Sequence, residues 1–118
     1  MAFSPDGKVL ASSGRVDKII FWDPATGKEV RSFAGHPRGV NGIAFSRDGK
    51  LLASAGHDGV VRVCETATGR ERDWTKHREA PLKSVAFSPD GTMLASGGES
   101  NDARVWDEDT GKELQCFK

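Results

Sequence analysis

The apolar positions of the chain fall in short runs, and turns rich in Ser, Pro, Asp and Gly separate these runs. In residues 61–64 and 103–106 apolar residues alternate with arginine, which is typical of a β-strand with two different faces. Residues 9–12, 51–54 and 93–96 are largely apolar, as expected for strands inside a packed sheet. Because no segment keeps the spacing of an amphipathic helix, the pattern predicts an all-β fold.

The whole pattern occurs three times. The motif Phe-Ser-x-Asp-Gly begins at Phe3, Phe45 and Phe87, so successive copies are 42 residues apart. The same offset relates the pairs Trp22-Asp23, Cys64-Glu65 and Trp106-Asp107. Landmarks in constant register identify a repeat architecture, in which a unit too small to bury its own apolar face stacks on its neighbours.

Each unit is predicted to be a meander of four antiparallel strands. In its first turn, Pro sets φ, Asp bonds its own backbone and Gly accepts a positive φ. The fourth strand is more polar and is predicted around residues 30–33, 72–74 and 114–117, at the outer edge of the sheet. The three units span approximately residues 1–34, 35–76 and 77–118.

Composition narrows the possible partners and the location. The 17 basic and 17 acidic side chains cancel, whereas nucleic-acid-binding modules usually carry a basic excess. No apolar run is long enough to cross a bilayer and the first residues do not form a signal peptide. We therefore expect no nucleic acid, no membrane and a cytoplasmic location. The two cysteines, Cys64 and Cys116, are expected to be reduced, buried thiols on different strands.

Four motifs together carry a resemblance to a known family. They are the FSPDG turn, the LASGG-like second strand, the Trp-Asp pair and the dipeptide Gly35-His36. With them, essentially the whole chain resembles the WD-repeat family of β-propellers. The resemblance implies twisted four-stranded blades around a channel, about three of them in this chain, whereas propellers usually have four to eight. We expect either further copies of the chain or missing sequence to complete the ring.

The resemblance also implies a polar network in each blade, made by a His, a Ser or Thr, an Asp and the Trp. The residues assigned to it are Ser12 and Trp22 in the first blade, His36, Ser54 and Asp58 in the second, and His77, Ser96 and Trp106 in the third. Cys64 stands where the second blade should have its Trp. Because buried polar groups must be hydrogen-bonded, we expect these networks to be structural.

The residue types of the second network also occur in hydrolases. A Ser-His-Asp triad needs an exposed nucleophile near an oxyanion site, and nothing in the sequence resembles a nucleophile elbow. The histidines come from separate repeats, and no paired Cys or His spacing indicates a metal site. We expect no catalysis, no cofactor and no metal.

The leading hypothesis is a non-catalytic scaffold that binds a protein or peptide partner. Its surface would lie on the loops at one end of the blades, with Arg15, Arg38, His57, Arg78 and Glu99 as candidate residues. Copies of the chain would close the propeller as a homo-oligomer, two copies giving six blades and three giving nine. Two alternatives remain: a fragment of a larger propeller without binding activity of its own, and an enzyme with a site at the channel mouth.

Overall fold

A computed structural model gives the fold of most of the chain. It describes residues 2–13, 18–34, 36, 39–68, 70, 76–77, 81–98, 103–107 and 112–117. Within these ranges every helix or strand is a β-strand, which confirms the predicted all-β fold. None of the described residues belongs to a helix long and apolar enough to cross a membrane.

The strands form three antiparallel sheets of four strands each. The first sheet contains β1 (Ala2–Phe3), β2 (Leu10–Ser13), β3 (Lys18–Trp22) and β4 (Glu29–Ala34). The second contains β5 (Val40–Phe45), β6 (Leu51–Gly56), β7 (Val60–Glu65) and β8 (Lys76–His77). The third contains β9 (Leu82–Phe87), β10 (Met93–Gly98), β11 (Ala103–Asp107) and β12 (Glu113–Phe117). In each sheet the strands lie in chain order, which confirms the predicted meander.

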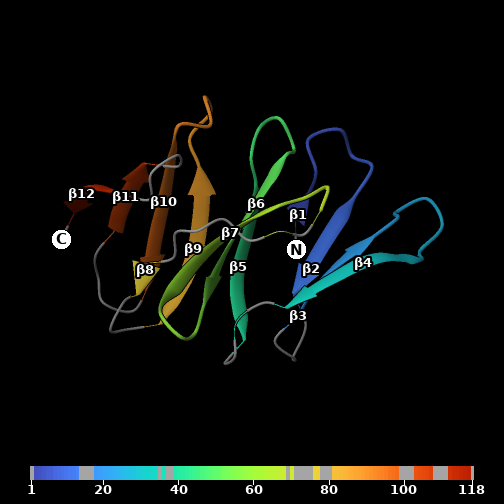
Figure 1. Cartoon of the computed structure of the whole chain (residues 1–118), viewed down its shortest axis with the longest axis horizontal. Coiled ribbons are helices and arrows are strands. Elements are labelled where there is room, and N and C mark those ends of the chain that lie inside the picture. Colours follow the sequence, from blue (N-terminus) through green and yellow to red (C-terminus); the bar gives the residue numbers. More distant parts are fainter. Residues whose placement is uncertain are drawn as a thin grey trace.

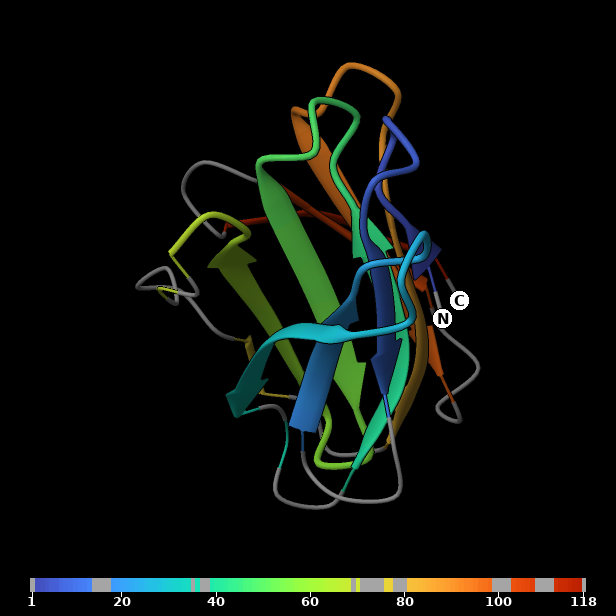
Figure 2. The ribbon, with the colours of Figure 1, turned by 90° about the vertical axis from the view of Figure 1, so that its right-hand side faces the viewer.

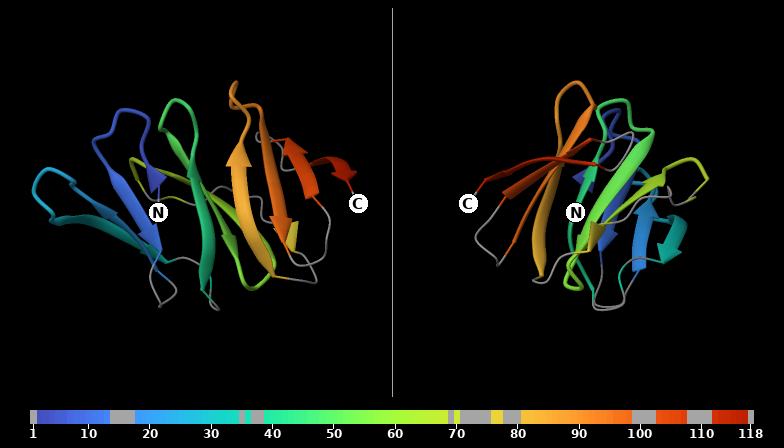
Figure 3. Two further views of the ribbon diagram at one scale, coloured as in Figure 1. Left: turned by 180° about the vertical axis from the view of Figure 1, so that it is seen from behind. Right: turned by 60° about the vertical axis from the view of Figure 1, so that its left-hand side comes forward.

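The three sheets stand side by side in chain order, with the second sheet between the other two (Figures 1 and 3). Seen from the end of the row, the first sheet lies nearest the viewer and no other sheet stands in front of it (Figure 2). The inner strands β5 and β9 come close together: the amide of Asn41 donates to the carbonyl oxygen of Leu82 at 2.7 Å. A Cβ at Gly42 would lie 2.9 Å from the carbonyl oxygen of Lys83, so this approach depends on glycine.

Strand pairing follows the 42-residue offset except along the fourth strand of the second sheet. Ala34 pairs with Lys18 in the first sheet, whereas in the second sheet His77 pairs with Val60. The offset is therefore 42 on the third strand and 43 on the fourth. As a result β8 lies at Lys76–His77, beyond the predicted residues 72–74, which fall outside the described residues.

The first turn of each unit has the same hydrogen bonds in all three sheets. In the first sheet, the hydroxyl of Ser4 donates to Asp6 at 2.6 Å and accepts from the N–H of Val9 at 3.1 Å. The backbone N–H of Gly7 donates to the carbonyl oxygen of Ser4 at 2.9 Å. Gly7, Gly49 and Gly91 have φ values of 73°, 75° and 75°. These positive values, which side chains rarely adopt, confirm the predicted role of glycine in the turn.

Each sheet has two faces, which we name by their neighbours. The leading face points toward the preceding sheet, and the trailing face points toward the following one.

The first junction lies between the first and second sheets. It joins the trailing-face residues Ala11, Ile19 and Phe21 to the leading-face residues Val40 and Leu52. Four partly buried residues pack against this cluster: Val9, Ile43, Phe45 and Cys64. The rings of Phe21 and Phe45 lie 5.8 Å apart between centroids.

The second junction lies between the second and third sheets. Its trailing-face residues are Ala53, Ala55, Val61 and Val63, its leading-face residues are Leu82, Val85, Leu94 and Trp106, and Ala44, Leu51 and Phe87 pack against them. The second sheet therefore buries apolar side chains on both faces, and the first and third sheets each do so on one. Burial of this kind is the main stabilising contribution in a protein of this size.

Candidate functional site

The polar network of the second sheet is assembled around a buried histidine. His36 lies between β4 and β5 and is 0 % exposed. Its Nδ1 is 3.0 Å from Oδ1 of Asp58, and its Nε2 is 2.9 Å from Oγ of Ser54. Asp58 also accepts a hydrogen bond from the backbone N–H of Val60 at 3.1 Å, which fixes the carboxylate in the turn between β6 and β7. The three side chains thus tie the β4–β5 connection to the sheet.

A glycine makes the space that the imidazole ring occupies. A Cβ at Gly56, the last residue of β6, would collide with the ring of His36 and with Oδ1 of Asp58. Repeat patterns alone do not reveal this requirement, because Gly56 belongs to a run of small residues that also suits a tight turn. The need for glycine comes from the contact between the imidazole ring and the backbone at Gly56, and residue spacing does not reveal this contact.

The same three groups have the order of contacts found in a hydrolase triad. A catalytic serine must present its oxygen to a substrate beside hydrogen-bond donors for the oxyanion. Ser54 is only 3 % exposed and its hydroxyl is occupied by the imidazole. The geometry therefore suits a network that satisfies buried polar groups and fixes a loop.

The first and third sheets contain a shorter version of the network. The indole Nε1 of Trp22 donates to Oγ of Ser12 at 2.8 Å, and that of Trp106 donates to Oγ of Ser96 at 2.9 Å. Each bond links the second and third strands of one sheet. In the second sheet Cys64 cannot supply the indole N–H, and Oγ of Ser54 bonds to His36 instead.

His77 does not occupy the position expected from the resemblance. Its backbone pairs with Val60, as that of Ala34 pairs with Lys18, so by pairing it corresponds to Ala34. The one-residue change of offset along the fourth strand explains the difference. The side chain of His77 lies outside the described part of the structure.

One of the five candidate partner-binding residues lies within the described residues. His57 is exposed in the β6–β7 turn, and its backbone N–H donates to the carbonyl oxygen of Gly39 at 3.1 Å. This bond joins the β6–β7 turn to the β4–β5 connection at one end of the second sheet. The other four candidates, Arg15, Arg38, Arg78 and Glu99, lie outside the described residues.

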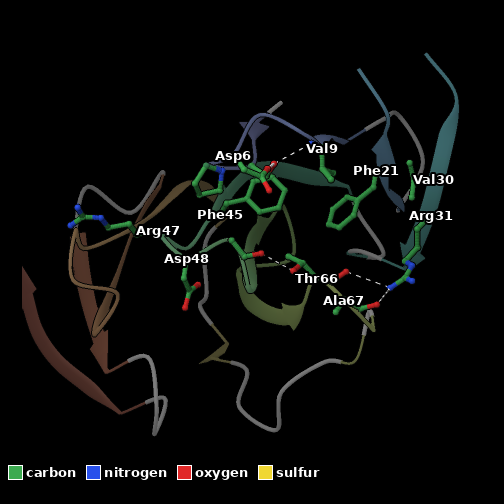
Figure 4. Close-up of a pocket in the computed structure, with 13 residues that line it drawn as sticks. Asp6, Val9, Phe21, Val30, Arg31, Phe45, Arg47, Asp48, Thr66 and Ala67 are labelled. Atoms are coloured by element: carbon green, nitrogen blue, oxygen red, sulfur yellow. Dashed lines mark hydrogen bonds between the residues drawn. The ribbon is translucent and has the colours of Figure 1, made fainter. Parts of the chain in front are cut away.

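A groove of about 610 Å³ opens between the first and second sheets, at the end opposite His57. Figure 4 shows Val9, Phe21 and Phe45 on its apolar wall, with charged residues at the rim. Arg31 crosses the groove and donates to the carbonyl oxygens of Thr66 and Ala67. This cation therefore connects β4 to the end of β7, across the two sheets.

The carboxylates of the first turns are fully ionised at neutral pH. Donation by the Ser4 hydroxyl lowers the pKa of Asp6, and the Ser46 hydroxyl lowers that of Asp48 in the same way. The hydroxyl of Ser88, followed by the backbone N–H of Thr92, lowers the pKa of Asp90 to about 2. Each carboxylate accepts its hydrogen bonds within its own hairpin. Hydrogen bonds to the charged form of a carboxyl group favour that form and so lower its pKa.

Within the described residues, no group of three or more His, Cys, Asp and Glu side chains is placed to hold a metal ion. The thiols of Cys64 and Cys116 are half-buried, on β7 of the second sheet and β12 of the third. The prediction that both are buried is therefore met in part.

Three four-stranded meanders standing side by side define a repeat protein of the β-propeller class. The sequence pattern described as "WD domain, G-beta repeat" matches residues 27–65 and 70–107, which is more than half of the chain. The chain belongs to the WD-repeat family.

Comparison with known proteins agrees with this assignment. An uncharacterized WD repeat-containing protein, alr3466, of Nostoc sp. (strain PCC 7120) is 46% identical over 41 residues, which cover 35% of this chain and 3% of that protein. The crystal structure of RRP9 WD40 repeats and the structure of U3-55K each superpose with a TM-score of 0.91 at 21% identity. Each superposition covers 98% of this chain and 37% of the other. The chain thus spans little more than a third of these structures, and at this identity they show the fold alone.

Proposed function

We propose that the chain is a non-catalytic scaffold for protein–protein interaction, acting in the cytoplasm as part of a closed propeller. The observation that supports this function most is the burial of the His36–Ser54–Asp58 network, which keeps a constellation of catalytic residue types inside the fold and away from a substrate. WD-repeat domains generally provide binding platforms, and this is an argument from the fold. The loops around His57 and Gly39 are the part of the platform that lies within the described residues.

The proposed scaffold is complete only when further blades close the row of sheets into a ring. Among the sheets that the structure describes, the first and the third each have a neighbour on one face alone (Figure 3). Large apolar surfaces favour association in water. We propose that copies of the chain close the ring, as two copies with six blades or three copies with nine.

The solution mass tests the proposal. Light scattering at several protein concentrations should give two or three times the 12.7 kDa of a single chain. A well-dispersed protein that stays at 12.7 kDa at every concentration would contradict ring formation by copies.

One alternative has a specific observation in its favour. The chain covers 37% of its structural neighbours and 3% of the Nostoc protein, so the missing blades could belong to the same polypeptide. In that case the isolated chain would remain monomeric or associate without a defined number of copies, and the light-scattering experiment separates the two cases.

The partner-binding surface has its own test. Reversal of charge in Arg38→Glu and Arg78→Glu should reduce the recovery of a protein or peptide partner in a pull-down without changing the solution mass. The matched control is Lys28→Glu, at an exposed residue outside the candidate loops. Equal recovery with all three variants would place the binding surface elsewhere.

A further inference from the structure

We propose that the trailing face of the third sheet binds the leading face of the first sheet in a second copy, with the indole of Trp22 received beside Val105. The inference rests on the proposed ring and specifies its interface. The argument compares the two junctions between the described sheets with the leading face of the first sheet and the trailing face of the third, which no described sheet covers.

The leading face of the first sheet has the residues that are buried in the other two sheets. Phe45 and Phe87 pack against the first and second junctions, whereas the equivalent Phe3 is 62% exposed. On the second strands, Leu52 is 1% and Leu94 is 0% exposed. The equivalent Leu10 is only half-buried. This face therefore carries the side chains of a junction without the sheet that would cover them.

The trailing face of the third sheet shows the complementary condition. Ala53 and Val61 are both 0% exposed in the second junction. Their equivalents in the third sheet, Ala95 on β10 and Ala103 on β11, are exposed. Met93, the counterpart of Leu51, is a large exposed side chain on the same face, at the first residue of β10. Beyond it, the small Ala95 and Ala103 leave room for the large groups of a leading face.

The sizes of the side chains indicate which leading face fits. In the first junction, the large Phe21 shares a cluster with the small Cys64. In the second junction, the smaller Val63 shares a cluster with the large Trp106. By the 42-residue offset, Val105 corresponds to Val63 and Trp22 to Trp106. Placing Val105 and Trp22 in one cluster would thus repeat the combination of side chains found in the second junction.

The same argument favours a head-to-tail contact over a symmetric one. Two trailing faces would bring Ala95, Ala103 and Val105 against their own copies, and small side chains on both sides leave voids that cost packing energy. Joining a trailing face to a leading face matches small residues with large ones. Such a contact is heterologous, and it closes into a ring when the rotation between copies permits.

Two blocking variants test the contact. Phe3→Arg obstructs the leading face, and Ala95→Arg obstructs the trailing face; both residues are exposed within the single chain, so the fold should persist. Each variant alone should run at 12.7 kDa by light scattering. Mixed in equal amounts, they retain one intact junction and should form a dimer of one copy of each, and no larger species. Ala25→Arg, in an exposed turn away from both faces, should assemble as the unchanged chain does.

The outcomes separate this inference from the proposed ring. If the unchanged chain is monomeric, both proposals fail. If it assembles and either blocked variant still assembles alone, or if the mixture stays monomeric although each variant shows an unchanged circular dichroism spectrum, the ring proposal survives and this interface is wrong.

A second experiment tests the size match itself. Val105→Phe should reduce assembly because Phe and Trp22 would compete for the same space. Adding Trp22→Cys should restore it, since the pair would then resemble Phe21 and Cys64. Full assembly of Val105→Phe alone would overturn the proposed position of Trp22.

Discussion

The first and second junctions bury equivalent positions with side chains of different size. The first combines Phe21 on the trailing face with Cys64 on the leading face, and the second combines Val63 with Trp106. Both have fully buried small residues on the second strand, Ala11 in one and Ala53 in the other. The larger side chain of the two is therefore on the trailing face in the first junction and on the leading face in the second.

This difference shows that the departure of Cys64 from the Trp-Asp pair is not a local defect. Protein interiors are packed to the density of organic crystals, so a smaller side chain on one face needs a larger one opposite. Phe21, which is larger than the equivalent Val63, adds volume to the cluster against which Cys64 packs. The loss of the indole N–H is also accommodated, because Ser54 bonds to His36 in the second sheet.

The largest expected effect comes from removing the indole of the second junction. Trp106→Ala should lower the free energy of unfolding by about 3–5 kcal/mol, because Trp106 is 4% exposed and its removal leaves a cavity. Trp22→Ala should cost clearly less in the monomer, since Trp22 is half-buried. Denaturant unfolding at low protein concentration measures both, and equal losses would contradict the difference between covered and open faces.

A smaller loss is expected where the His36 network meets the backbone. Gly56→Ala should destabilise the chain by about 3 kcal/mol, near the upper end of the cost of overpacking, because the new methyl group collides with the imidazole. In a His36→Ala background the same substitution should cost less. Additive losses in a double-mutant cycle would show that the ring and Gly56 are not coupled.

Two substitutions can give the first junction the side chains of the second. The repeat pattern alone predicts that Cys64→Trp raises the melting temperature, whereas packing against the cluster of Phe21 predicts the opposite. We expect Cys64→Trp to cost about 1–3 kcal/mol through overpacking. The double variant Cys64→Trp/Phe21→Val, which copies the second junction, should recover most of that loss. A rise in melting temperature for Cys64→Trp alone would show that the first junction has unused space.

The smallest effect concerns the first turns, which are alike on both sides of each junction. Ser88→Ala should raise the pKa of Asp90 from about 2 toward its ordinary value of 3.8, because the hydroxyl is the main group that stabilises the carboxylate. The stabilisation is present above pH 3.8 and is lost as pH falls toward 2. Carboxyl chemical shifts followed by NMR measure this pKa, and an unchanged value would assign the shift to the backbone N–H of Thr92.

The repeat offset was sufficient to predict the meander and the turns, and the family resemblance indicated which Trp and Ser residues to pair within one sheet. Gly7 and its equivalents, like the Trp–Ser pairs, depend on residues close in the chain, so a fixed spacing specifies them. The offset of 43 on the fourth strand of the second sheet escaped because the sequence offers Trp74 as the counterpart of Phe33, and this match puts the strand at residues 72–74. It shifts His77 to the position of Ala34.

The packing between sheets could not be predicted from one sequence. Phe21 and Cys64 belong to different sheets, and they share a cluster because of how those two sheets are placed. Likewise, the need for glycine at position 56 follows from where the ring of His36 lies. Both depend on three-dimensional placement, which residue spacing does not encode.

The Ser-x-Asp-Gly hairpins have a consequence for the folding pathway. Their bonds join residues no more than five positions apart, such as Ser4 and Val9. Closing such short loops loses little chain entropy, and hairpins form within about 1–10 μs. The contacts between sheets join distant residues, so we expect folding to begin at three separate hairpins and to be limited in rate by the docking of one sheet on the next.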